Sequence, residues 1–235
     1  MTLPDWLGTL AAALPGIRGE QLGRLLPPRE GARRQAAVLA LFGAGPEPDL
    51  LLIERAATMR SHAGQPAFPG GRIDPGDDGP VGAALREAQE EVGLDPASVE
   101  VLGTLPELWL PPSGFAVTPV VGWWRDPHPV RVVDAAEVAS VVRVPVARLT
   151  DPEHRWTVTH PSGYVGPAFD TGDLLVWGFT AGVLDRLLAF AGWERPWDAT
   201  RTRELPADVV ALALASSPAY EPVVPEADRT GSTLP

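Results

Sequence analysis

The chain has 235 residues, no cysteine and a formal net charge of −11. Its length favours one packed domain with extensions over two full domains. The acidic balance argues against nucleic acid as a main partner, since phosphate backbones are held by clustered basic residues, and the absence of cysteine excludes disulfides and cysteine-based zinc sites.

The N-terminal segment bears on where the protein works. Residues 1–20 lack the basic region of a secretory signal, and their apolar run is shorter than the roughly 20 residues that span a bilayer. We therefore expect a cytoplasmic protein with no membrane partner. Residues 5–14 carry apolar residues at helical spacing and are followed by Pro15 and Gly16, which predicts a short helix within an N-terminal helical extension at 1–30.

The rest of the chain alternates between strand and helix patterns. Residues 36–42 and 50–55 are apolar runs joined by a turn-rich segment, which predicts a hairpin. Further strands are expected at 99–105, 116–124 and 138–146, a late hairpin within 154–179, and helices at 81–92, 180–193 and 206–216. We place the main domain at 31–195 and a C-terminal extension at 196–235, with a loose, partly disordered tail from 217.

The helix at 81–92 carries a cluster of acidic side chains. Its apolar residues form one stripe that packs, while Glu87, Glu90 and Glu91 are neighbours at i, i+3 and i+4 and are expected to face a cleft or solvent. Like charges at this spacing cost roughly 0.2–0.5 kcal/mol per pair, and Arg86 relieves only part of that cost through Glu90. One explanation is a solvated acidic face. The other is a bound cation, because Mg²⁺ prefers a few carboxylate oxygens completed by water and substrate phosphates.

The sequence around this helix favours the cation. Residues 70–94, GGRIDPGDDGPVGAALREAQEEVGL, resemble the Nudix box, and the run REAQEEVGL matches the core of that box fully. Asp77 stands where the box has an early Glu, and the loop to Arg86 is one residue longer than the common form. The preceding segment 51–71, LLIERAATMRSHAGQPAFPGG, resembles the signature of the coenzyme A pyrophosphatase branch of the Nudix hydrolases, with Ile53 and Ala56 in place of its usual hydroxyl residues.

This resemblance implies a fold, a reaction and a metal site. The fold is an α/β/α sandwich around a mixed sheet. The reaction is Mg²⁺- or Mn²⁺-dependent hydrolysis of the pyrophosphate bond of coenzyme A or its thioesters, giving 3′,5′-ADP and a 4′-phosphopantetheine product. Glu87 and Glu91 match the metal-binding positions, and the Gly70 position gives its backbone carbonyl to a metal. Glu90 is a candidate for a further metal ligand or for the group that assists the water, and Arg86 holds the Glu array in place.

Substrate recognition is expected from the branch signature. Arg55 and Arg60 are candidates for the substrate phosphates, because a guanidinium fork matches phosphate oxygens, although each can equally be a surface Arg. His62 and Gln65 either contact the substrate or brace the loop. Glu137 is either a distal base or only the start of a strand.

Two other functions compete with this one. Another Nudix specificity, such as ADP-ribose or NADH, uses the same metal helix with a different recognition loop, and the run RSHAGQPAFPGG argues against it. A non-catalytic nucleotide-binding module can lose a Glu from the box, and this chain keeps all three. A coenzyme A-like small molecule is the expected partner, and a homodimer is a possible assembly.

Overall fold

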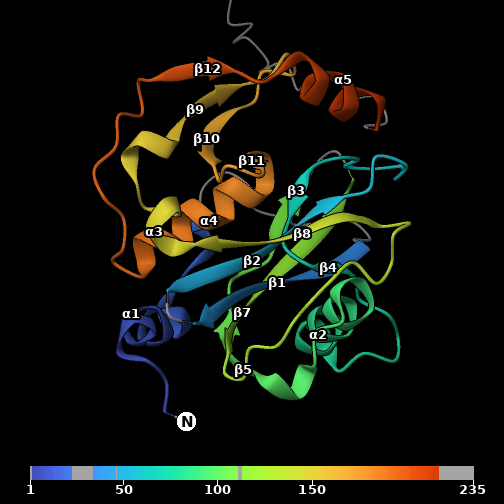
Figure 1. Cartoon of the computed structure of the whole chain (residues 1–235), viewed down its shortest axis with the longest axis vertical. Coiled ribbons are helices and arrows are strands. Elements are labelled where there is room, and N and C mark those ends of the chain that lie inside the picture. The colour runs from blue at the N-terminus through green and yellow to red at the C-terminus, as the bar shows by residue number, and fades with distance from the viewer. Residues whose placement is uncertain (1, 23–33, 46, 111–112, 217–235) are drawn as a thin grey trace, which may run out of the picture.

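The computed structural model describes residues 2–22, 34–45, 47–110 and 113–216. Figure 1 shows a main sheet with helices on both of its faces and a second, smaller sheet stacked above it. The strands of the main sheet are β1 (Arg34–Ala44), β2 (Pro48–Arg55), β3 (Pro66–Ala67), β4 (Gly70–Arg72), β5 (Val99–Thr104), β6 (Leu108–Leu110), β7 (Phe115–Trp124) and β8 (Val138–Pro145). Those of the second sheet are β9 (Arg155–Thr159), β10 (Val165–Asp170), β11 (Leu175–Val176) and β12 (Thr202–Glu204).

The helices differ in length and place. The α-helices are α1 (Asp5–Ala13), α2 (Gly79–Val92), α3 (Val146–Leu149), α4 (Gly178–Phe190) and α5 (Ala207–Ala215), and short 3₁₀ turns lie at Leu14–Gly16, Gly19–Leu22, Pro96–Ser98 and Pro152–His154. Helix α2 ends at Gly93, which adopts the left-handed conformation expected of a helix stop. Within the described ranges, none of the helices has the length and apolar content needed to cross a membrane.

The main sheet is mixed. Strand β1 pairs in parallel with β7, and its hairpin with β2 is antiparallel, as predicted. Along β1 the side chains alternate: Leu39 and Leu41 join the core under α2, whereas Ala40 and Phe42 join the core under α1 and α4. This period of two places an apolar layer on each face of the sheet, and helices cover both layers. The predicted α/β/α sandwich around a mixed sheet is confirmed.

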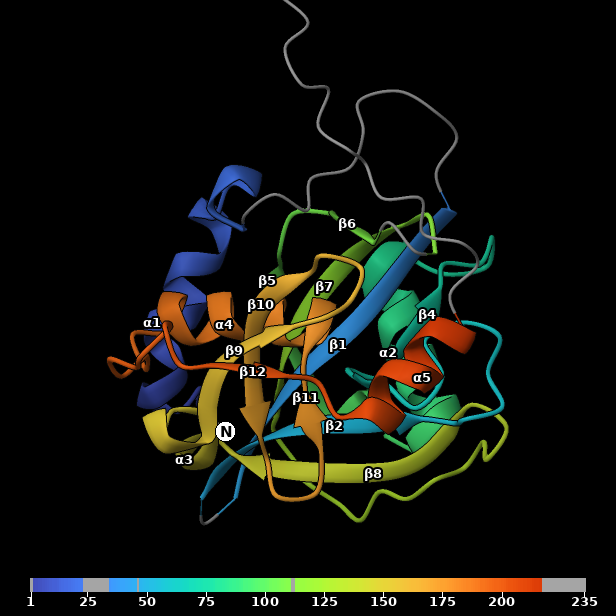
Figure 2. The same ribbon diagram turned by 90° about the horizontal axis from the view of Figure 1, so that it is seen from above.

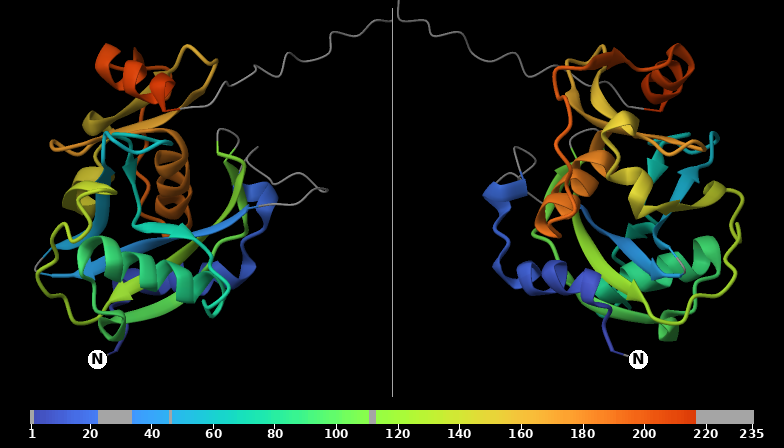
Figure 3. Two further views of the ribbon diagram at one scale, coloured as in Figure 1. Left: turned by 90° about the vertical axis from the view of Figure 1, so that its right-hand side faces the viewer. Right: turned by 60° about the vertical axis from the view of Figure 1, so that its left-hand side comes forward.

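The second sheet is a smaller unit with its own core. It has the strand order β11-β10-β9-β12 and buries Trp156, Val158 and Leu205. Strand β12 lies after residue 195 and pairs in parallel with β9, so the segment assigned to the C-terminal extension contributes to this sheet. Figure 3 shows α4 between the two sheets. The predicted tail from 217 and residues 23–30 of the predicted N-terminal extension lie outside the described residues.

Candidate active site

The three glutamates of α2 lie in three different environments. The Glu91 residue is 2% exposed, whereas the side chains of Glu87 and Glu90 are 14% and 58% exposed. The expectation that all three face a cleft or solvent is therefore wrong for Glu91. The reason is spacing: Ala84 and Ala88 lie seven and three residues before Glu91, on the buried stripe of α2, and Glu91 continues that stripe.

Glu91 is a buried carboxylate with one hydrogen-bond partner in the described part of the chain. Its Oε2 accepts a hydrogen bond of 2.9 Å from the Gly70 backbone N–H, while its Oε1 is buried and has no hydrogen-bond partner among the described residues. The pKa of Glu91 is raised to about 8, mainly by burial, and the charges of Glu87 and Glu137 act in the same direction. The Gly70 bond and the charge of Arg55 act in the opposite direction without offsetting the burial.

Glu87 lies against the glycine pair that begins β4. A Cβ built on Gly71 would lie 2.5 Å from the Glu87 Oε1 and 2.6 Å from its Oε2, so a side chain at position 71 would displace this carboxylate. Burial raises the pKa of Glu87, and an ion pair of 3.0 Å with the Arg86 Nη2 opposes that shift. The backbone of β4 thus contacts both Glu87 and Glu91.

Arg86 joins the loop before α2 to the helix itself. Its Nε and Nη2 donate to the two Asp77 carboxylate oxygens at 2.8 and 3.1 Å, its Nη2 donates to the Arg72 carbonyl at 3.0 Å, and its Nη1 donates to the Glu90 Oε2 at 2.8 Å. The bonds from Arg86 lower the pKa of Asp77, so this carboxylate stays ionised. The shorter Asp at the early Glu position therefore still receives both guanidinium bonds.

The branch signature folds back on the end of β2. The Arg55 N–H donates to the Gln65 carbonyl at 3.0 Å, and the Gly64 N–H donates to the Arg55 carbonyl at 3.1 Å. His62 has a φ of 57° and its Nδ1 lies 3.0 Å from the Gln65 Oε1, while burial lowers its pKa. A non-glycine residue in this backbone region is uncommon and is often found at functional sites. The structure therefore brings Arg55, His62 and Gln65 together, whereas Arg60 is exposed.

Glu137 lies beside the candidate site from another part of the chain. It precedes β8, and its carbonyl accepts a hydrogen bond of 2.8 Å from the Ala56 N–H. Its charge raises the pKa of both Glu87 and Glu91, which places its carboxylate on the same side as theirs. The only sequence signal for this position is an acidic residue directly before a buried strand.

The site has some of the features that a divalent cation needs. Among the described residues, no three His, Asp or Glu side chains are grouped closely enough to hold a metal by themselves. Mg²⁺ does not require such a cage, because it is held by one or two carboxylates together with water and substrate phosphates. The unpartnered, buried Oε1 of Glu91 beside Glu87 fits this kind of open site.

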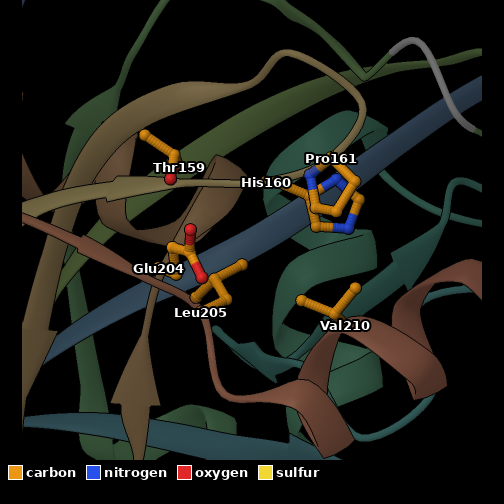
Figure 4. A pocket seen from close by; sticks show the side chains of 6 residues that line it. All are labelled: Thr159, His160, Pro161, Glu204, Leu205 and Val210. Atoms are coloured by element: carbon orange, nitrogen blue, oxygen red, sulfur yellow. The ribbon is translucent and has the colours of Figure 1, made fainter.

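A separate cavity of about 260 Å³ lies between the turn after β9 and helix α5 (Figure 4). It is lined by Thr159, His160, Pro161, Glu204, Leu205 and Val210. None of the predicted site residues lines it. The candidate active site is instead the surface formed by α2, β4 and the loop after β2.

Several known proteins resemble this chain in sequence or in fold. The profile of the NUDIX domain matches residues 32–161. An uncharacterized Nudix hydrolase NudL of Citrobacter koseri is 39% identical over 198 residues, which cover 80% of this chain and 93% of that protein. The NudL of Cronobacter sakazakii is 44% identical over 167 residues, which cover 70% of this chain and 85% of that protein.

A solved structure supports the fold alone. The Nudix hydrolase RenU of M. smegmatis superimposes with a TM-score of 0.50 at 21% identity, covering 75% of this chain and 99% of that one. Nudix hydrolases generally use divalent metal ions, in agreement with the open carboxylate site on α2. The chain therefore belongs to the Nudix hydrolase family and is an enzyme that hydrolyses pyrophosphate-containing small molecules.

Proposed function

We propose that the enzyme hydrolyses the pyrophosphate bond of coenzyme A or its thioesters, giving 3′,5′-ADP and 4′-phosphopantetheine or its acyl form. The observation that carries the proposal is the position of Arg55. This residue belongs to the branch signature, and its charge acts directly on the buried carboxylate of Glu91. A phosphate group between Arg55 and a cation on Glu91 would satisfy both charges.

Mg²⁺ or Mn²⁺ is the proposed cofactor. Glu87 and Glu91 would hold it through their carboxylates, with the Gly70 carbonyl as a further ligand. When bound, such a cation neutralises charge that develops on the phosphate oxygens and makes a coordinated water easier to deprotonate. Arg86 keeps α2 and the preceding loop in a fixed arrangement through its bonds to Asp77.

A carboxylate must also take the proton from the attacking water. Glu90 is the first candidate, either as this base or as a further metal ligand, and Glu137 is the second because its charge acts on both Glu87 and Glu91. Glu90→Gln and Glu137→Gln keep the size of the side chain and should keep the fold. A variant that loses about 10²-fold or more in kcat and also loses the acidic limb of the pH–rate profile identifies the general base, whereas a loss reversed by excess metal indicates a metal ligand.

We assign substrate recognition to the last residue of β2 and the loop that follows it. Arg55 would bind the pyrophosphate, the exposed Arg60 would bind the 3′-phosphate, and His62 and Gln65 would contact the substrate or brace the loop between them. Arg60→Ala should then lower kcat/KM for coenzyme A by about ten- to a hundredfold. It should leave dephospho-coenzyme A, which lacks the 3′-phosphate, almost unchanged. Arg55→Ala should weaken both substrates.

The decisive experiment compares substrates. The purified protein is incubated with coenzyme A, NADH or ADP-ribose and either metal, and the products are identified by mass. The expected result is 3′,5′-ADP from coenzyme A at the highest kcat/KM. Faster cleavage of ADP-ribose or NADH would assign a different Nudix specificity, and binding without cleavage would indicate a nucleotide-binding module. The cytoplasmic location and the homodimer stay predictions.

A further inference from the structure

Helix α5 packs against the loop that follows β2, although the two are far apart in the sequence. Figure 2 shows the end of α5 beside this loop. A Cβ built on Gly64 would overlap the Cδ2 methyl of Leu212 and lie 3.3 Å from its Cγ. The Leu212 side chain therefore occupies the space that a side chain at position 64 would need.

A hydrogen bond reinforces this contact. The Ser216 Oγ accepts from the Ala63 N–H at 3.2 Å and donates to the Leu212 carbonyl at 3.0 Å. Ala63 and Ser216 are both buried. Leu212 and Ser216 are one turn apart, so one face of α5 holds two successive residues of the loop.

The loop that α5 contacts carries recognition residues and no candidate metal ligand. Gly64 bonds to the Arg55 carbonyl, and the neighbouring His62 and Gln65 bond to each other. The glutamates of α2 depend on different contacts, namely the Gly70 N–H and the Arg86 guanidinium. A disturbance of α5 therefore reaches Arg55 and His62 first, and it reaches the candidate metal ligands only through the charge of Arg55.

We infer that Leu212 and Ser216 are positioning residues for substrate recognition, and that α5, which lies beyond the matched Nudix region at 32–161, sets the affinity for substrate through the loop 61–65. The kinetic part of this inference rests on the proposed function. The structural part, that α5 orders the loop, does not.

The chain offers a matched pair of variants for the test. Leu212→Ala removes the side chain beside Gly64, and Leu214→Ala makes the same change two residues along on the same helix, at a residue that is 52% exposed. Leu212→Ala should raise KM for coenzyme A by about tenfold with kcat almost unchanged, because misplaced recognition groups weaken binding while the metal helix stays in place. Leu214→Ala should leave both constants at the parent values.

Hydrogen exchange of the peptide that contains residues 61–65 supplies a readout that needs no activity. Its amides should exchange faster in Leu212→Ala than in the parent and in Leu214→Ala. Ser216→Ala should act in the same direction and Ser216→Thr, which keeps the hydroxyl, should restore slow exchange. Equal exchange in all variants would overturn the inference, as would a fall in kcat at constant KM. A parent enzyme that does not cleave coenzyme A would refute the proposed function, and the exchange data would still decide whether α5 orders the loop.

Discussion

Glu91 and Asp185 are both buried carboxylates, but of the two only Asp185 forms ion pairs with Arg side chains among the described residues. Asp185 on α4 forms ion pairs with Arg155 on β9 and with Arg186, and Arg155 also pairs with Glu194 at 3.3 Å and lies 4.2 Å from the centre of the Trp197 ring. Glu91 has one backbone hydrogen bond and an unpartnered oxygen.

The difference separates a structural charge from a functional one. Burying a charge is costly unless it is paired, so a carboxylate with a buried Arg partner is part of the fold. A carboxylate buried without such a partner can be stabilised by a cation that binds from outside, and groups with perturbed pKa values of this kind concentrate at functional sites.

The largest effect is expected at Glu91. Glu91→Gln keeps the size and the helix propensity of the side chain but removes the charge that would bind the cation. Turnover should fall by about 10²- to 10³-fold, the usual cost of losing one group that stabilises developing charge. Steady-state kcat at saturating Mg²⁺ measures this loss, with circular dichroism as the control for folding. Near-parental turnover in a folded variant would remove Glu91 from the metal site.

The next effect is on stability and concerns Asp185. Asp185→Leu leaves Arg155 buried with only Glu194 to pair with, and breaking a buried pair in this way costs about 3–5 kcal/mol of unfolding free energy. The double variant Arg155→Met/Asp185→Leu should recover much of this loss, because no buried charge is left. Urea unfolding measures both values. If the double variant is as unstable as the sum of its single variants, the pair is not a coupled unit.

A smaller effect links Glu91 to pH in the metal-free protein. Burial raises the pKa of Glu91 from 4.5 to about 8, so the folded state favours the protonated form. The resulting stability is complete below the unfolded pKa and is lost as the pH rises through the folded value. With EDTA at about pH 8, Glu91→Gln should therefore be more stable than the parent by more than about 1 kcal/mol.

Two controls accompany this measurement. Near pH 4.5, where the Glu91 carboxyl is protonated in the folded state, parent and variant should melt at similar temperatures. Adding Mg²⁺ at the higher pH should raise the Tm of the parent and leave that of the variant unchanged. A parent that is the more stable of the two in EDTA at the higher pH contradicts the account of Glu91.

The smallest effect is expected at Arg186. This side chain is 42% exposed, and Asp185 keeps its buried partner Arg155 when Arg186 is removed. Arg186→Ala should cost less than about 1 kcal/mol, as exposed ion pairs usually do. Urea unfolding of this variant and of Arg155→Met compares the free energy of unfolding lost with the exposed cation and with the buried cation of the same carboxylate. A larger loss would mean that Arg186 carries the pairing instead of Arg155.

The features that were predictable from the sequence are those encoded by neighbouring residues. The hairpin of β1 and β2, the stop of α2 at Gly93 and the apolar stripe of α2 all follow from local pattern. The hydrogen bond between Glu91 and Gly70 does not, because it depends on how α2 packs against β4. Likewise, the parallel pairing of β12 with β9 joins segments more than forty residues apart, and no local signal specifies it.

The same limit applies to the site residues. The motif identifies Glu87, Glu90 and Glu91, but their contacts depend on how α2 packs against the sheet. The bond between Arg86 and Asp77 could be expected from their places in the motif, whereas the approach of Glu137 requires β8 to pair with β2. The sequence therefore predicts which residue types form the site, but not their burial or the resulting shifts in their pKa values.

The parallel pair of β1 and β7 has a consequence for how the enzyme is made. Arg34 pairs with Phe115, so the strand that holds β4 in place is itself completed by a segment synthesised much later. Pairing of such distant segments is slow, because the entropy of closing a long loop is lost before the contacts between the strands can stabilise the pair. We therefore expect the contact between Glu91 and Gly70 to become stable only after that closure. A nascent chain that has not yet produced β7 is then expected to lack an ordered catalytic surface.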